Sequence, residues 1–77
     1  MEYDRDRVDE AVLALLYLNF HDAPPLTRAW KSLPWESLDR LYERGQITDP
    51  KTSAKSVIMT EQGKEAAEML FLSLFGK

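Results

Sequence analysis

The stretch that decides the fold is LDRLYERGQI, residues 38–47. Leu38 and Leu41 recur at helical spacing and mark the buried side of a helix. Gly45 follows them, and glycine is the residue most often found in the left-handed conformation just past a helix C-terminus. The stretch therefore predicts a helix that has Pro34 at its first position, where the missing N–H costs nothing, and that ends at Gly45.

After Gly45 the pattern changes from helix to strand. Residues 46–49 and 56–59 contain β-branched pairs, and the polar residues 50–55 between them are typical of a turn. These three segments predict a β-hairpin with a long polar tip. Thr60 is a favourable N-cap for a last helix. That helix carries small or apolar residues at helical spacing: Gly63, Ala66, Ala67, Leu70, Phe71 and Leu74.

The N-terminal half is predicted to hold two further helices. Residues 6–19 carry an apolar stripe at helical spacing, and this helix has to stop before Pro24-Pro25. A short second helix is expected over residues 26–32, between two proline-containing segments. The order helix, short helix, helix, β-hairpin wing and C-terminal helix predicts an α+β, mainly helical, winged-helix-like fold, in a single domain over residues 1–77.

Two segments resemble a part shared by many bacterial winged helix-turn-helix regulators. Residues 38–47 end in Gly-Gln-Ile, and residues 57–63 run through Met-Thr-Glu-Gln-Gly. In those proteins a helix ends at Gly-x-Ile, a wing follows, and its second strand runs into Leu-Thr-x-x-Gly, so Met59 stands where leucine is commoner. The match covers about a third of the chain, and it implies a fold rather than a function.

The whole chain is also similar to a small bacterial family of uncharacterised winged-helix-type domains, a domain of unknown function. Residues 9–18, 28–31 and 49–57 carry this resemblance, together with Trp35 and Leu38-Asp39. Pro34 is a departure, because an acidic N-cap before the tryptophan is more usual, and it puts in doubt only where the helix starts. The resemblance implies the fold and a bacterial origin, and it brings no catalytic residues.

Composition narrows the classes of function. The chain has no cysteine, which excludes disulfides, thiolate metal sites and thiol catalysis and is compatible with a reducing cytoplasm. The longest apolar run, residues 11–18, is far shorter than the roughly 20 residues that cross a bilayer. The N-terminus is charged and mixed in sign, unlike a signal peptide. We therefore expect a cytoplasmic protein without a membrane segment.

No set of residues carries catalytic chemistry at a recognisable spacing. His21 is the only histidine, and we expect a surface-loop residue rather than a metal ligand. Asp9 and Glu10 are expected in solvent, in the first turns of a helix, where the helix dipole favours acids. A nucleophile–base pair and a phosphate-binding glycine loop are both missing. The sequence thus predicts a protein that is not an enzyme, with no catalytic, cofactor-binding or metal-binding residues and no cofactor.

The two terminal helices are apolar on more than one side. On a helical wheel, six large residues fall away from the main stripes: Leu13, Tyr17, Phe20, Met69, Leu72 and Phe75. Surplus apolar surface usually marks an interface, so these residues form a possible interface for a homodimer or a protein partner. The alternative is that the two helices pack on each other and use up most of this surface.

DNA binding is the second hypothesis for function, after a non-catalytic interaction or dimerisation module. The net charge of −3 opposes it, and so do the three acids against two bases on the outward side of helix 34–44. Lys51 and Lys55 are possible wing contacts to phosphate. A basic face made of Arg28, Lys31, Arg40, Arg44 and Lys51 would favour DNA. A toxin–antitoxin or phage-related accessory role is compatible with the small size alone.

The tryptophans are the remaining candidates for stacking on nucleic-acid bases. Trp35 is expected to fill the core around the short helix. Trp30 stays open between the core and an exposed position, because Arg28 and Lys31 beside it favour a partly solvated turn.

Overall fold

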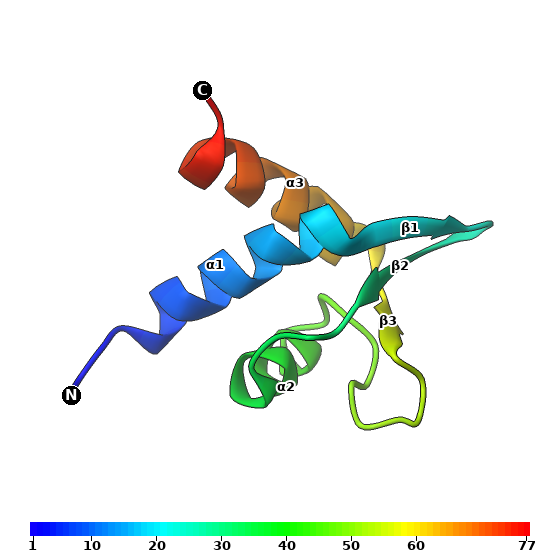
Figure 1. Cartoon of the computed structure of the whole chain (residues 1–77), viewed down its shortest axis with the longest axis horizontal. Coiled ribbons are helices and arrows are strands. Elements are labelled where there is room, and N and C mark those ends of the chain that lie inside the picture. Colours follow the sequence, from blue (N-terminus) through cyan, green and yellow to red (C-terminus); the bar gives the residue numbers. More distant parts are fainter.

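The computed structural model describes residues 1–77 except for the side chains of Asp22 and Ala23. About half of the chain is helical, and the fold is α+β, as predicted. The elements in chain order are α1 (Arg5–Leu16) with a 3-10 turn (Tyr17–Asn19), β1 (Phe20–Ala23), β2 (Leu26–Trp30), α2 (Trp35–Glu43), β3 (Ser56–Ile58) and α3 (Glu61–Phe75). In Figure 1, α1 lies between α3 and α2, and the strands lie beyond the C-terminal end of α1.

The three helices of 12, 9 and 15 residues occupy the regions that their apolar spacing predicts. Asp4 caps α1, since its Oδ1 accepts hydrogen bonds from the backbone N–H groups of Asp6 at 3.0 Å and Arg7 at 3.2 Å. Pro34 is the N-cap of α2 rather than its first helical residue, and it makes no side-chain cap bond.

The predicted short helix over residues 26–32 is wrong, because this segment forms β2, the middle strand of a three-stranded antiparallel sheet. Ala29 pairs with Phe20 of β1 on one side and with Val57 of β3 on the other. A helix confined between two proline segments would be too short to be stable alone. As a strand, the same residues satisfy their backbone on both sides and bury Ala29 completely.

The predicted hairpin between residues 46–49 and 56–59 forms only in part. Ile47 and Met59 make an isolated antiparallel bridge, and the backbone N–H of Thr48 donates to the carbonyl oxygen of Ile58 at 3.0 Å. The main partner of β3 is instead β2. With a strand in place of the second helix, the helix-turn-helix half of the predicted layout is missing, and the winged-helix assignment is not confirmed.

The junction between α2 and α3 is as the sequence predicts. Gly45 has φ +75°, in the left-handed region, and the N–H groups of Gly45 and Gln46 return to the carbonyls of Tyr42 and Leu41, both at 3.0 Å. Thr60 then caps α3 by accepting from the Gly63 N–H at 3.0 Å.

The hydroxyl of Thr60 also donates to the Gly45 carbonyl at 2.7 Å. A Cβ at residue 63 would collide with the backbone of Gln46, so only glycine lets α3 approach this closely. The two segments that resemble winged-helix proteins thus lie side by side and join α2 to α3.

The core lies where α1, α2 and α3 meet the sheet. Its buried apolar residues come from every part of the chain: Val12, Leu13, Leu16, Ala29, Leu38, Leu41, Ile47, Val57, Met59 and Ala67. Leu70 packs partly buried against this cluster. Trp35, expected in the core, is absent from it and is 55% exposed. The core therefore consists of aliphatic residues rather than of the tryptophans.

Candidate functional site

The predicted interface residues of the N-terminal helix lie largely inside the protein. Leu13 is 2% exposed and belongs to the core, so its expected exposure is wrong. Tyr17 and Phe20 are partly buried against the same core. The Tyr17 ring packs in a tilted orientation against Phe71 of α3 at a centroid distance of 5.1 Å and meets Phe20 edge-on at 5.4 Å. This side of α1 is covered because α3 packs on it, as the alternative considered from the sequence predicts.

The predicted interface residues of α3 remain at the surface. Met69, Leu72 and Phe75 are 71%, 60% and 48% exposed, and they follow one another at three-residue spacing along the last turns of α3. The same helix buries Gly63 and Ala67 on its opposite side. We call Met69, Leu72 and Phe75 the apolar face of α3. The six predicted residues are therefore divided between the inside of the protein and one exposed helix face.

The two lysines predicted as wing contacts differ in their surroundings. The Nζ of Lys51 lies 3.8 Å from Oδ2 of Asp39 on α2, whereas no ion pair is described for the exposed Lys55. The loop that carries both is tied to the end of β2 by Lys31. The Lys31 ammonium donates to the carbonyl oxygens of Pro50 at 2.6 Å and Thr52 at 3.0 Å. The loop is thus anchored on the protein rather than projecting freely as a wing.

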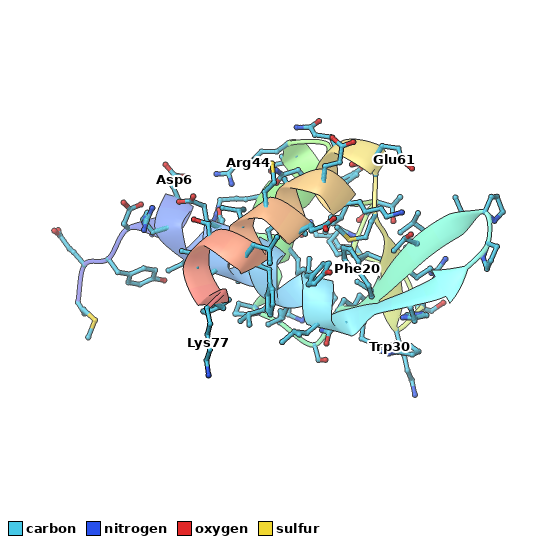
Figure 2. The ribbon with its side chains drawn as sticks, turned by 90° about the horizontal axis from the view of Figure 1, so that it is seen from above. Asp6, Phe20, Trp30, Arg44, Glu61 and Lys77 are labelled. Carbon is cyan, nitrogen blue, oxygen red and sulfur yellow. The ribbon has the colours of Figure 1, made fainter. Side chains whose placement is uncertain are left out.

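The most strongly connected polar group is the buried carboxylate of Asp9. Nε of Arg40 donates to its Oδ2 at 2.6 Å, and Nη2 of Arg40 donates to its Oδ1 at 2.9 Å, which makes a bidentate pair between α1 and α2. Arg44 lies 3.4 Å from the same Oδ2 and also donates to Asp6 at 3.0 Å. Figure 2 shows Asp6 and Arg44 on one side of the molecule.

The sequence-based placement of Asp9 in solvent and of Arg40 on the outward side of its helix is wrong. The two residues are 31 positions apart, and neither helix contains a local feature that would reveal the pair. Burial acts to raise the pKa of the Asp9 carboxyl, but the hydrogen bonds from Arg40 and Ser37 and the charges of Arg40 and Arg44 outweigh burial and hold this pKa below its ordinary value. A carboxylate held ionised in this way is suited to joining two helices rather than to transferring protons.

The basic face that would favour DNA binding does not assemble. Arg40 and Arg44 turn toward the carboxylates of α1, and Lys51 lies beside Asp39. Arg28 donates from Nε to the Ser56 hydroxyl at 2.7 Å. Most of the cations expected on that face are thus engaged within the protein.

A pocket that the sequence did not predict lies where β2 ends and α2 begins. It has a volume of about 400 Å³ and is lined by Trp30, Lys31, Ser32, Trp35 and Lys55; we call it the tryptophan pocket. Trp30 is 50% exposed and lies at the edge of the molecule in Figure 2. The close spacing of Trp30-Lys31 and Trp35 is the sequence feature that could have indicated this pocket. The prediction that Trp35 lies in the core excluded that interpretation.

A second hollow, of about 550 Å³, also borders Trp35 and lies between the start of α2 and the N-terminal part of the chain. Tyr3, Val8, Glu36 and Arg40 line it. Its cation, Arg40, is already bound to Asp9, and Glu36 adds a negative charge. This hollow therefore has less attraction for an anion than the tryptophan pocket.

His21 is part of β1 rather than of a surface loop. Its ring stacks on Trp30 at 4.3 Å with an interplanar angle of 20°, and its Nδ1 lies 3.2 Å from the Asn19 carbonyl oxygen. Among the residues whose side chains are described, no group of three His, Asp or Glu residues could hold a metal ion. In the part of the chain that the structure covers, no helix has the length and apolar character needed to span a bilayer.

Comparison with known proteins gives a family and one relative. Residues 4–77 match the family described as Domain of unknown function (DUF6429). The chain is 47% identical over 75 residues to the Uncharacterized protein y4hR of Sinorhizobium fredii (strain NBRC 101917 / NGR234), and the alignment covers 97% of each chain. No solved structure matches the chain.

Proposed function

The chain belongs to the family Domain of unknown function (DUF6429), and we propose that it is a small, non-catalytic interaction module that forms a homodimer through the apolar face of α3. The observation that carries this proposal is the exposure of Met69, Leu72 and Phe75 on one side of a helix whose other side is packed. Large apolar residues grouped on a surface typically mark a contact with another protein.

A second copy of this chain suits this face because the face is self-complementary. In a two-fold symmetric pair of antiparallel α3 helices centred on Leu72, Leu72 meets its own copy and Met69 meets Phe75 of the second copy. Sulfur–aromatic contacts of this kind are favourable. The apolar residues therefore agree with one symmetric arrangement.

The non-catalytic part of the proposal rests on how the polar groups are used. Asp9, the buried carboxylate, is bound on both oxygens by Arg40. His21 is stacked on Trp30. The Asp9 carboxylate is thus committed to joining α1 to α2. The same proposal treats residues 1–77 as one domain and places it in the bacterial cytoplasm, which is supported by the lack of cysteine.

DNA binding remains the alternative, with weaker support. A helix entering the major groove needs cations that face the phosphates, but Arg40 of α2 and Arg44 at its C-terminal end bind carboxylates of α1 instead. A winged-helix relationship is proposed only for the local contact of residues 45–47 with residues 59–63. This contact supports the fold relationship and adds nothing to affinity for DNA.

Sedimentation equilibrium over a concentration series tests the dimer. We expect the mass of a dimer at high concentration. The variant Leu72→Glu should raise the dissociation constant at least about a hundredfold, because the symmetric contact would bury two unpaired carboxylates. The matched control is Leu18→Glu, which changes a leucine of similar exposure, 65% against 60%, outside α3. A wild-type chain that stays monomeric throughout, or equal effects of the two variants, would contradict the proposal.

A further inference from the structure

The tryptophan pocket brings together the only two tryptophans of the chain. Their side chains come from β2 and from the first residue of α2, and each leaves about half of its surface in solvent, 50% for Trp30 and 55% for Trp35. Indole rings are normally largely buried in folded proteins. Two half-exposed indoles that line the same hollow offer flat surfaces on which a planar ligand can stack.

Both indoles are held in place before any ligand arrives. The His21 ring covers one face of Trp30 at 4.3 Å, and Nδ2 of Asn19 donates to the Trp30 carbonyl at 3.0 Å. Lys31 lies 5.6 Å from the centre of the Trp35 ring, and two loop carbonyls fix its ammonium group. Rigid positions of this kind reduce the entropy that binding costs.

The charge of the pocket selects an anion. Lys31 and Lys55 line it together with Ser32, and among the residues whose side chains the structure describes, none that lines it carries a carboxylate. The hydrogen-bond acceptors of the Lys31 ammonium are backbone carbonyls and not an acidic side chain. The pocket is thus a cationic site on a chain whose net charge is −3. A cationic ligand, which exposed aromatic rings can also attract, would be repelled by the two lysines.

We propose that the tryptophan pocket binds a nucleotide unit, with the base stacked on an open indole face and the phosphate beside Lys55. The volume of about 400 Å³ lies within the usual range for small-ligand sites. The nucleotide has two possible sources, a free mononucleotide or one position of a single strand. Duplex DNA does not fit this chemistry, because its bases are already stacked on one another. The site goes beyond the proposed dimer, since in Figure 1 α3 lies on the other side of α1 from α2.

Tryptophan emission reports directly on this pocket, because both fluorophores line it. The protein is titrated with adenosine monophosphate and with a short single-stranded oligonucleotide, with excitation at the red edge of indole absorption where bases do not absorb. We expect saturable quenching that weakens as salt increases, and no quenching by inorganic phosphate alone. Tighter binding of the oligonucleotide identifies a strand as the source, and equal binding identifies the free nucleotide.

Two variants and one control separate the pocket from nonspecific attraction. Trp35→Ala keeps Trp30 as the reporter and should weaken binding about tenfold or more. Lys55→Ala should weaken it as well, whereas Lys64→Ala, at an exposed lysine on α3, should leave affinity unchanged. Thermal melting shows that each variant is folded, and Lys55→Ala tests the site even if Trp35→Ala unfolds.

Three results would overturn the proposal. The first is no quenching by either nucleotide up to millimolar concentration. The second is an equal loss of affinity in Lys55→Ala and Lys64→Ala, which would mean that the attraction is nonspecific. The third is quenching by an acidic peptide but not by nucleotides, which would assign the pocket to a protein ligand. The Leu72→Glu variant should bind nucleotide as the wild type does, so failure of the dimer and failure of this site are distinguishable.

Discussion

Helix α1 contacts its two neighbouring helices through different chemistry. Toward α2 the contact is ionic, with the buried Asp9 bound by Arg40. Toward α3 it is apolar and aromatic: Tyr17, which directly follows α1, packs on Phe71, and Ala67 of α3 is fully buried. Burial of apolar surface stabilises the folded state wherever it occurs. A buried ion pair stabilises it only when the geometry of the pair is good enough to offset the cost of removing both charges from water. We therefore expect the α3 side to supply stability and the α2 side to fix the position of α2.

The largest effect should come from the apolar side. Leu13→Ala removes a side chain that is 2% exposed and leaves a cavity, so the free energy of unfolding should fall by about 3 kcal/mol. The matched variant Leu72→Ala, at a leucine 60% exposed, should cost less than about 0.5 kcal/mol in the monomer. Chemical denaturation at low protein concentration measures both. Equal losses would mean that the distinction between the core and the apolar face of α3 is wrong.

The ionic side should be the next most sensitive, and its effect should depend on pH. Asp9→Asn keeps the shape of the side chain but loses the charge, and it should cost about 2 kcal/mol at neutral pH. The control Asp6→Asn removes the exposed partner of Arg44, 83% exposed, and should change stability by less than about 0.5 kcal/mol.

The sign of the pH effect follows from the lowered pKa of Asp9. A carboxyl whose pKa is lower in the folded than in the unfolded state stabilises the fold above its ordinary pKa of about 4, and this contribution is lost as pH falls through the lowered value. The difference in stability between wild type and Asp9→Asn should therefore shrink in acid. A difference that stays constant down to strongly acidic pH would contradict the ionic description of this contact.

A smaller effect on stability is expected at Thr60, where α2 and α3 are joined. Thr60→Ala removes the α3 cap to Gly63 and the hydrogen bond to the Gly45 carbonyl, and the melting midpoint should fall by an amount equivalent to about 1 kcal/mol. Thr60→Ser keeps the hydroxyl and should retain most of the stability. If Thr60→Ser lowers stability as much as Thr60→Ala does, the methyl group of Thr60 and not its hydroxyl makes this contact.

The smallest effect on stability is expected at the exposed ion pair between Lys51 and Asp39. Replacing Lys51 and Lys55 together with alanine removes the 3.8 Å contact to Asp39 and should change stability by less than about 0.5 kcal/mol. Thermal melting at low and high salt is the measurement. A loss comparable to that of Asp9→Asn would show that the loop lysines have a structural role that their exposure does not indicate.

Local patterns predicted much of the fold because their causes are local. Gly45 adopts the left-handed conformation and Thr60 caps α3, as their residue types imply. β2 was predicted as a helix because neither of its partner strands was recognised: Phe20 of the preceding β1 pairs with Ala29, and Ser56, much later in the chain, pairs with Trp30. Between two proline segments the local sequence leaves both conformations open, and the partner strands decide.

The candidate sites were predictable only in part, for the same reason. Periodicity identified Leu72 as surplus apolar surface, but it could not show that Leu13, equally displaced on its helical wheel, would be covered by a helix more than forty residues later. Asp9 was predicted to be solvated because acidic residues are common in the first turns of exposed helices. Its pairing with Arg40 is not visible in the local sequence. Trp35 was predicted in the core because tryptophan is a large apolar residue. Its exposure depends on the path of the chain from β2 to α2.

The most direct test of the central claim is a single cysteine at the proposed two-fold axis. The chain has no cysteine, so the variant Leu72→Cys carries one thiol, and the variant Leu18→Cys carries one at a similarly exposed leucine outside the interface. Under mild oxidation at low protein concentration, we predict that Leu72→Cys rapidly forms a disulfide-linked dimer and that Leu18→Cys stays largely monomeric. Equal rates of crosslinking for the two variants would contradict pairing through the apolar face of α3.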